Sequence, residues 1–179
     1  MASTKPEGVH YVQNLFPVDF LSRLDALRES LPSDDGASHL MVANRKYFQD
    51  KDLAQELLSY LHRDSRFTSI SHIVADMRFI EYNGGGYIAP HRDGVAVDPF
   101  THRASTTSFL LYLSTVGDDQ GGTTEFLASL DDGIGGADPL YIISPIRGAI
   151  AVFPHTIPHQ GTPTGDDGNP KILLRGEAY

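Results

Sequence analysis

The stretch GAIAVFPHTIPHQGTPTGDDGNPKILLRGEAY, residues 148–179, decides the fold. It divides into a strand that ends at Phe153, a corner at PHTIP, a strand from His159, a turn at GDDGNP and a last strand from Lys171. Short β-branched and aromatic runs bounded by Gly, Pro and Asp are typical of strands. In a hairpin closed by GDDGNP, the last strand runs back beside the strand of His159, so the two strands can line one cavity.

The same pattern extends back to about Ser69. The further short runs are HIVADMRFIEY, STTSFLLYLS, GGTTEFLAS and LYIIS. Many short strands without helices between them indicate a sandwich, a barrel or a jelly roll, and not a parallel sheet. The sequence therefore predicts a mainly β core over residues 69–179.

The first third of the chain has a helical period instead. In PVDFLSRLDALRESLP, apolar residues recur at helical spacing and Pro32 closes the segment. In DKDLAQELLSYLHRD, leucines recur in the same way behind an Asp cap. We expect residues 1–68 to form a helical support region that packs against the β core. A length of 179 residues then fits one α+β domain over residues 1–179.

The composition limits the possible functions. The chain has no cysteine and a net charge of −9. Without thiolates, any metal has to be held by nitrogen and oxygen. An acidic chain with no basic block is a poor partner for nucleic acid or for an anionic membrane. With no apolar run that could cross a bilayer and no signal-peptide pattern, we expect a cytoplasmic protein that acts on small molecules or exposed peptide segments.

A histidine and an aspartate stand close together in YIAPHRDGV, residues 87–95, directly after the glycine run NGGG. The group could be a polar turn, half of an acid/base pair, or two ligands of a metal. Side chains alternate along an extended strand, so His91 and Asp93 point the same way and can reach one point. A third ligand could come from the corner or the strand that follows it, where His155 and His159 are the candidates.

Two basic residues mark the last strand. Lys171 and Arg175 are four positions apart and share a face of that strand. A metal held by two histidines and one carboxylate keeps open coordination positions, as in non-haem Fe(II) oxygenases. A dicarboxylate co-substrate that chelates such a metal needs a cation for its far end.

At these residues the sequence resembles the Fe(II)/2-oxoglutarate-dependent dioxygenases, in particular the prolyl 4-hydroxylase-like branch. The resemblance runs from about Arg78 to Tyr179. Its motifs, in order, are RFIEYNGGGYIAPHRDG, RASTTSFLLYLS, GGTTEFL and GAIAVFPHTIPHQGTP…KILLRGEAY. It implies a double-stranded β-helix, a jelly-roll barrel with the iron near its open end, which agrees with the strand pattern.

Carried over position by position, the resemblance makes His91, Asp93 and His159 the ligands of Fe(II). His159 is followed by Gly and Pro in HQGTP, as the distal histidine is in this branch. The rival histidine is His155, which lies in the proline-flanked corner and farther from the cations of the last strand.

The resemblance also implies a site for 2-oxoglutarate. Lys171 matches the usual basic residue of the final strand, which binds the distal carboxylate of the co-substrate. Arg175 matches a second recurrent basic position, so both residues are candidates for that role. Tyr82 matches an aromatic hydroxyl that contacts the co-substrate, although it could equally be an ordinary half-buried strand tyrosine.

The activity that the resemblance implies is hydroxylation of an unactivated C–H bond with Fe(II), 2-oxoglutarate and O2, with ascorbate as the reductant. Succinate and CO2 would be released, and the substrate could be a prolyl peptide, a free amino acid or a small metabolite. The alternatives are a cupin-like metal-binding enzyme without 2-oxoglutarate and a non-catalytic jelly-roll binding module. We expect the loop at residues 94–103 to act as a lid, and Arg78 either to meet the substrate or to pair with Asp76 or Glu81.

Overall fold

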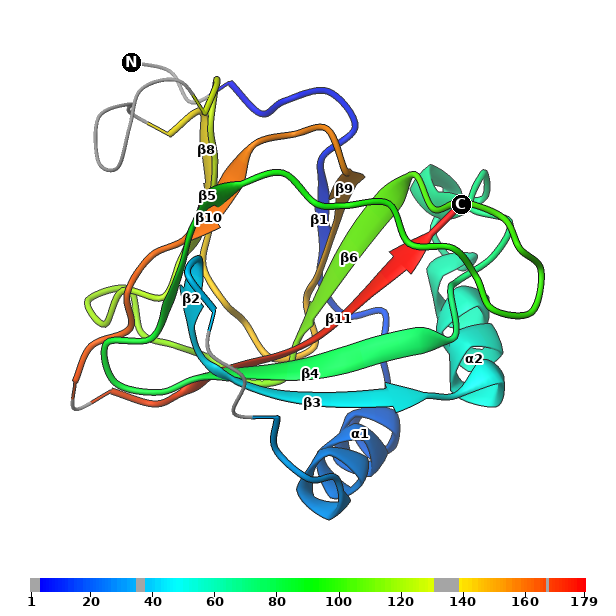
Figure 1. Cartoon of the computed structure of the whole chain (residues 1–179), viewed down its shortest axis with the longest axis horizontal. Coiled ribbons are helices and arrows are strands. Elements are labelled where there is room, and N and C mark those ends of the chain that lie inside the picture. The colour runs from blue at the N-terminus through cyan, green and yellow to red at the C-terminus, as the bar shows by residue number, and fades with distance from the viewer. Residues whose placement is uncertain (1–3, 35–37, 131–138, 167) are drawn as a thin grey trace.

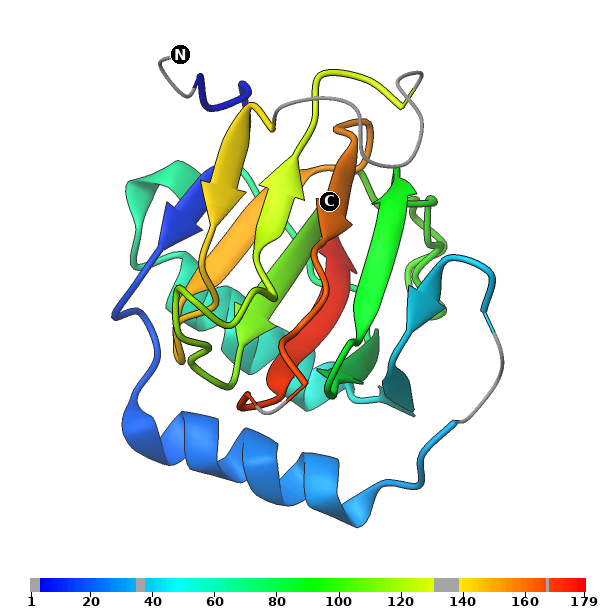
Figure 2. The same ribbon diagram turned by 90° about the vertical axis from the view of Figure 1, so that its left-hand side faces the viewer.

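The computed structural model describes residues 4–34, 38–130, 139–166 and 168–179. Its strands form two sheets that face each other, as seen end-on in Figure 1 and from the side in Figure 2. One sheet has the order β1-β9-β6-β11-β4-β3 and the other the order β2-β5-β10-β7-β8, and all neighbours pair antiparallel. This is the predicted jelly-roll architecture.

The elements have the following bounds. The strands are β1 (His10–Val12), β2 (Met41–Val42), β3 (Asn44–Gln49), β4 (Asp76–Tyr82), β5 (Tyr87–His91), β6 (Thr107–Tyr112), β7 (Thr124–Phe126), β8 (Tyr141–Ile143), β9 (Ile150–Pro154), β10 (His159–Gly161) and β11 (Lys171–Ala178). The helices are α1 (Val18–Ser30), α2 (Lys51–Leu61) and the 3₁₀ helix η1 (Ser65–Phe67).

Both predicted helices are present on the outer side of the six-stranded sheet (Figure 1). The Asp cap of α2 is confirmed, because the side chain of Asp50 accepts a hydrogen bond of 2.9 Å from the backbone N–H of Leu53. The first third of the chain also contributes β1, β2 and β3, which the sequence analysis missed. These strands lie at the edges of the sheets, and they are short or, like NRKYFQ in β3, mostly polar, so they carry little hydrophobic pattern.

Alternation along the strands of the larger sheet produces two cores. Side chains on its outer face, such as Phe79, Phe109 and Leu174, pack with the helices. Their neighbours on the inner face, such as Ile80 and Leu173, pack against the smaller sheet. Every second residue of each central strand therefore points into the space between the two sheets.

This parity determines where the polar residues of β11 lie. Leu173 faces inward, so Lys171, Arg175 and Glu177, which differ from it by even numbers of residues, face inward as well. All three are less than 9% exposed. The last strand thus places three charged side chains inside the jelly roll, where each needs a partner or a ligand.

Over the part of the chain that the structure describes, no helix is both long enough and apolar enough to span a lipid bilayer.

A glycine of β11 offers a test of this packing. A methyl group at Gly176 would lie 2.5 Å from Cζ of Phe109 on the neighbouring strand, so the ring would have to move. We expect Gly176→Ala to lower the free energy of unfolding by about 1–3 kcal/mol, as overpacked cores do. Urea denaturation measures the change.

The matched control is Gly94→Ala, because a methyl group there meets no atom within 4 Å. We expect this control to change the free energy of unfolding by less than about 1 kcal/mol. Equal effects of the two substitutions would show that β11 and β6 are not packed as described.

Candidate active site

Three side chains converge at one end of the smaller sheet. His91 is the last residue of β5 and His159 the first of β10, and the two are paired across the antiparallel strands. Asp93 follows two residues after His91. Their potential ligand atoms all lie within 4.8 Å of one another, and the described residues hold no second cluster of this kind among His, Cys, Asp and Glu. The structure therefore brings together the three residues that the sequence singled out.

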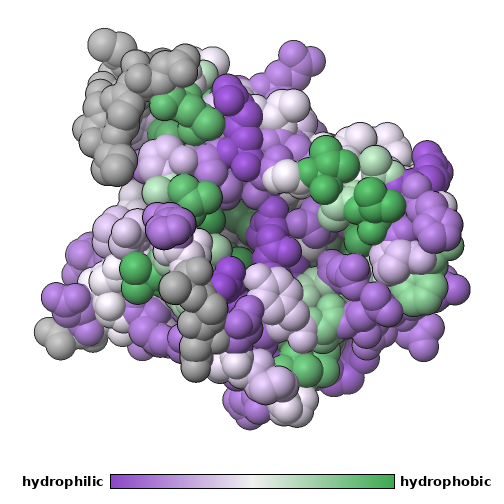
Figure 3. Space-filling view, in the orientation of Figure 1, coloured by the Kyte–Doolittle hydropathy of each residue, from purple (hydrophilic) through white to green (hydrophobic). Residues whose placement is uncertain are grey.

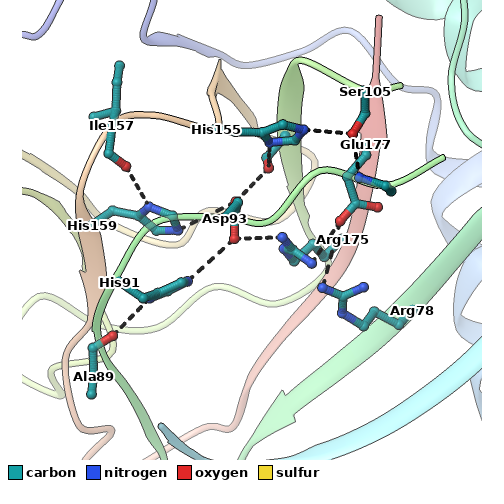
Figure 4. A network of polar contacts seen from close by, with 12 residues as sticks. Arg78, Ala89, His91, Asp93, Ser105, His155, Ile157, His159, Arg175 and Glu177 are labelled. Carbon is teal, nitrogen blue, oxygen red and sulfur yellow. Dashed lines mark hydrogen bonds and ion pairs between the residues drawn. The ribbon is translucent and has the colours of Figure 1, made fainter. Parts of the chain in front are cut away.

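Each histidine is oriented through its Nδ1 atom (Figure 4). Nδ1 of His91 lies 2.8 Å from the carbonyl oxygen of Ala89, and Nδ1 of His159 lies 3.1 Å from that of Ile157. A carbonyl can only accept, so Nδ1 donates a proton in both rings, and in the metal-binding tautomer Nε2 supplies the lone pair. The Nε2 atoms lie 3.5 and 3.8 Å from the two carboxylate oxygens of Asp93, so both lone pairs are directed at one place.

The carboxylate of Asp93 is held by two residues of the larger sheet. Nη2 of Arg175 lies 2.6 Å from Oδ1, and Ser108 donates a hydrogen bond of 2.5 Å to Oδ2. Burial alone would raise the pKa of Asp93, but the contacts with His91 and His159 and the bond from Ser108 outweigh it, so the pKa lies below its usual value. Asp93 is therefore ionised at neutral pH.

The second histidine of the pair is neutral at the same pH. Burial lowers the pKa of His159 to about 4, against the opposing charge of Asp93. The ring packs edge-on against Phe153, with ring centroids 4.7 Å apart. Two imidazole nitrogens and one carboxylate form a donor set that fits Fe(II) and leaves further coordination positions open.

His155, the rival third ligand, lies outside this cluster and supports it instead. Its Nδ1 atom lies 3.0 Å from Oγ of Ser108, and its Nε2 atom lies 2.7 Å from Oγ of Ser105. Ser108 uses its proton on Asp93, so it accepts from Nδ1–H of His155. Nε2 then accepts from Ser105, whose oxygen accepts the backbone N–H of Ala96. A directed chain of hydrogen bonds thus runs from the predicted lid loop to Asp93.

A cavity of about 220 Å³ opens beside the three side chains. The space-filling view shows this face hollowed near its centre, with hydrophobic residues inside the hollow and hydrophilic residues around it (Figure 3). Pockets for drug-sized ligands begin at roughly 300 Å³, so this cavity suits a smaller ligand.

Lys171 lies in this cavity and is 2% exposed. Its Nζ atom lies 3.2 Å from Oγ1 of Thr124 and 5.3 Å from the ring of Tyr82, which is paired with Lys171 across β4 and β11. No carboxylate of the described residues lies within 4 Å of Nζ. Burial lowers the pKa of Lys171 to about 7. This lysine is a buried cation that lacks a counter-ion.

Arg175, the other candidate for the distal carboxylate, already has partners. Besides Asp93, it approaches Glu177, with Nη1 at 2.9 Å from Oε1, close enough for an ion pair although not aligned as a hydrogen bond. Arg78 lies 3.7 Å from the same Oε1 atom. Of the two roles considered for Arg78, the pairing with Asp76 or Glu81 is wrong, because Asp76 is bonded by Gln49 and Glu81 pairs with Arg28. Figure 4 shows the resulting row of alternating charges.

Comparison with known proteins places this site in a family. Residues 77–176 match the model of the 2OG-Fe(II) oxygenase superfamily, which is more than half of the chain and spans the region from β4 to β11. The chain belongs to the 2OG-Fe(II) oxygenase superfamily. The resemblance found in the sequence is confirmed, and with it the assignment as an oxygenase that uses Fe(II) and 2-oxoglutarate. A search of the curated proteins found no sequence that matches this chain.

Solved structures of the same fold cover nearly the whole chain. A prolyl-4-hydroxylase from Pseudomonas putida has a TM-score of 0.65 and 18% identity, covering 96% of this chain and 91% of that one. A viral collagen prolyl hydroxylase from Paramecium Bursaria Chlorella virus-1, in complex with 2-oxoglutarate, has a TM-score of 0.63 and 14% identity, with 96% of both chains covered. HygX from Streptomyces hygroscopicus, with nickel and 2-oxoglutarate bound, has a TM-score of 0.61 and 10% identity, covering 96% and 82%.

Sequence reasoning did not single out Ser108 or Glu177, and it considered His155 only as a rival ligand. Ser108 lies on β6, whose other inward residues are Leu110 and Tyr112, and Glu177 lies on the inward face of β11, two residues after Arg175. The alternation of side chains along each strand could have identified both residues. Ser108 shares a strand face with the buried Leu110, and Glu177 shares one with the buried Leu173. His155 carries no such signal, since its role depends on how the corner folds.

The hydrogen-bond chain leads to a prediction about metal affinity. Ser108→Ala removes a donor from Asp93, and His155→Ala leaves Ser108 without its own donor. Loss of such a supporting partner typically costs about 10–100-fold in metal affinity, so we expect both variants to bind Mn(II) more weakly by about that factor. Isothermal titration calorimetry measures the affinity.

The control is Thr106→Ala, at the position next to Ser105. Within the described part of the chain, the hydroxyl of Thr106 forms a side-chain hydrogen bond only with Thr107. This variant should bind Mn(II) as the unmodified chain does. Complete loss of binding in His155→Ala would make His155 a ligand, and unchanged binding in Ser108→Ala would show that the chain of bonds does not support Asp93.

Proposed function

We propose that this oxygenase hydroxylates an unactivated C–H bond of a small molecule or an exposed peptide segment. His91, Asp93 and His159 hold Fe(II), and Lys171 binds the distal carboxylate of 2-oxoglutarate. The observation that carries the proposal is Lys171, a buried cation without a counter-ion in the same cavity as the three converging ligands. A dicarboxylate that reaches from the metal to Lys171 would satisfy both.

The geometry supports Lys171 over Arg175 for this role. Arg175 is engaged by Asp93 and Glu177, so a carboxylate could bind it only by competing with two existing ion pairs. Lys171 has no carboxylate within 4 Å among the described residues, and a bound carboxylate would restore the charged state that burial disfavours. Tyr82 packs its ring beside Nζ, which supports a place for Tyr82 in the wall of the co-substrate site.

When bound, Fe(II), 2-oxoglutarate and O2 would supply the oxidising chemistry, in which decarboxylation to succinate and CO2 is coupled to oxidation of the substrate. We propose ascorbate as the reductant that keeps the iron ferrous. The protein's own residues position and shield the reactants. Arg175 and Ser108 orient Asp93, and the Nδ1 donors orient both histidines. The buried ring of Tyr82 lines the cavity and excludes water there, and the buried ring of Phe153 packs against His159.

The alternatives receive less support. A cupin-like enzyme without 2-oxoglutarate would give Lys171 no role, and a non-catalytic binding module would be expected to lack a ligand, whereas the cluster is complete. Both small-molecule and peptide substrates have precedent in proteins of this fold. One Trichoplax adhaerens prolyl hydroxylase was solved with a hypoxia inducible factor peptide, and HygX was solved with hygromycin B.

The assignment of Lys171 is tested by titrating 2-oxoglutarate. We expect Lys171→Ala to raise the apparent KM for 2-oxoglutarate by roughly ten- to a thousandfold, because it removes a charge-assisted bond and leaves a partly buried carboxylate unpaired. Arg175→Ala should instead weaken metal binding or stability and leave the 2-oxoglutarate affinity of the metal-loaded protein within a few-fold. The opposite ranking would transfer the role to Arg175.

The same titration has a pH signature. With a pKa of about 7, Lys171 is charged below pH 7 and largely neutral above it before the co-substrate binds. A bound carboxylate raises that pKa, so binding above pH 7 takes up a proton and becomes weaker as the pH rises. Calorimetry at pH 8 in buffers of different ionisation enthalpy should detect the uptake, and Lys171→Arg should abolish it because arginine stays charged.

A further inference from the structure

The charges that line the cavity differ in sign from the chain as a whole. The chain has a net charge of −9, yet among the described residues the charged side chains that line the cavity are four cations and one carboxylate, Asp93. The cations are Arg78, Arg92, Lys171 and Arg175. An acidic protein thus lines this cavity almost entirely with positive charge, which indicates a preference for anions at this place.

Loading the site as proposed above does not cancel this excess. Fe(II) and 2-oxoglutarate carry equal and opposite charges. Asp93 and Glu177 offset two of the four positive charges, so a net charge of +2 remains. Lys171 faces the co-substrate in the proposed function and Arg175 pairs with Asp93, so Arg78 and Arg92 are the cations placed to meet a substrate.

The guanidinium group of Arg92 is largely available to a ligand. Arg92 lies between two proposed ligands in sequence, and its Nε–H donates a hydrogen bond of 3.0 Å to the carbonyl oxygen of Thr156. That bond anchors the side chain while it leaves the two terminal nitrogens available. Within the described part of the chain, no carboxylate lies within 4 Å of them.

Arg78 approaches the same cavity from the other sheet. It faces inward from β4, and its side chain stays 26% exposed, so it is reachable from solvent. Among the described residues, Arg78 has one carboxylate oxygen nearby, on Glu177 at 3.7 Å, and it lies over the ring of Tyr47. Five N–H donors in a planar fork are far from saturated by one long ion pair, so Arg78 retains donors for a ligand.

We infer that the substrate presents a carboxylate to Arg78 and Arg92 while its reacting carbon lies toward the metal ligands. The inference rests on the proposed function and specifies the substrate class: a small carboxylic acid such as an amino acid derivative, or a peptide with an acidic side chain. A neutral prolyl peptide would leave Arg78 with only its long contact to Glu177 and would give Arg92 no carboxylate partner among the described residues. The forked geometry of arginine suits bidentate contact with a carboxylate.

The test uses matched acids and amides as probes. The full chain is loaded with Mn(II) and 2-oxoglutarate, and calorimetry measures the Kd for N-acetylproline against N-acetylprolinamide, and for N-acetylleucine against N-acetylleucinamide. A pair of prolyl peptides that differ only by Glu or Gln forms the second arm. We expect an acid in at least one pair to bind tenfold or more tightly than its amide, and the arm in which this occurs identifies the source of the carboxylate.

Variants assign the preference to the two arginines. Arg92→Gln and Arg78→Gln should each remove most of the difference between acid and amide. Arg63→Gln is the matched control, because Arg63 is exposed, stacks on Tyr60 and lies outside the cavity, so this variant should keep the preference.

The possible failures can be told apart. Binding of 2-oxoglutarate to the Mn(II)-loaded chain is measured first, and its absence would overturn the proposed function together with this inference. If 2-oxoglutarate binds but no acid is preferred over its amide in either arm, or if the preference survives in both arginine variants, the carboxylate assignment alone is wrong.

Discussion

The ion pair between Asp93 and Arg175 is the interaction on which the rest of the site depends. Asp93 follows β5 of one sheet and Arg175 belongs to β11 of the other, so the 2.6 Å contact joins the two sheets across the interior. Removing one partner of a buried pair costs about 3–5 kcal/mol, because the other charge stays buried. The pair therefore holds the carboxylate in its direction, and the two histidines complete the cluster around it.

Much of the site could be predicted from the sequence through period-two alternation, while the resemblance to a known family chose the jelly roll among β folds and His159 as the third ligand. The alternation brings His91 and Asp93 to one point, and it places Lys171 and Arg175 on one face of the last strand. The partners of these groups could not be predicted in the same way. The bond from Ser108 to Asp93 and the contact of Arg175 with Asp93 join strands far apart in sequence, and their register is visible only in the folded chain.

The choice between the two cations of β11 illustrates the same limit. Sequence alone leaves Lys171 and Arg175 equivalent, since both are basic and face the same way. In the folded chain their surroundings differ, because Arg175 meets two carboxylates while Lys171 meets a threonine and two tyrosine rings. The charge state of the neighbours, and not the identity of the basic residue, is what separates a structural cation from one that is ready to bind a ligand.

The account is tested most directly by titrating Mn(II) into the chain and into two aspartate variants, with circular dichroism as the check on folding. We expect one Mn(II) per chain in the unmodified protein, no binding in Asp93→Ala, and unchanged binding in Asp76→Ala, whose exposed carboxylate pairs only with Gln49 among the described side chains. Binding of Mn(II) by folded Asp93→Ala with unchanged affinity would contradict the account.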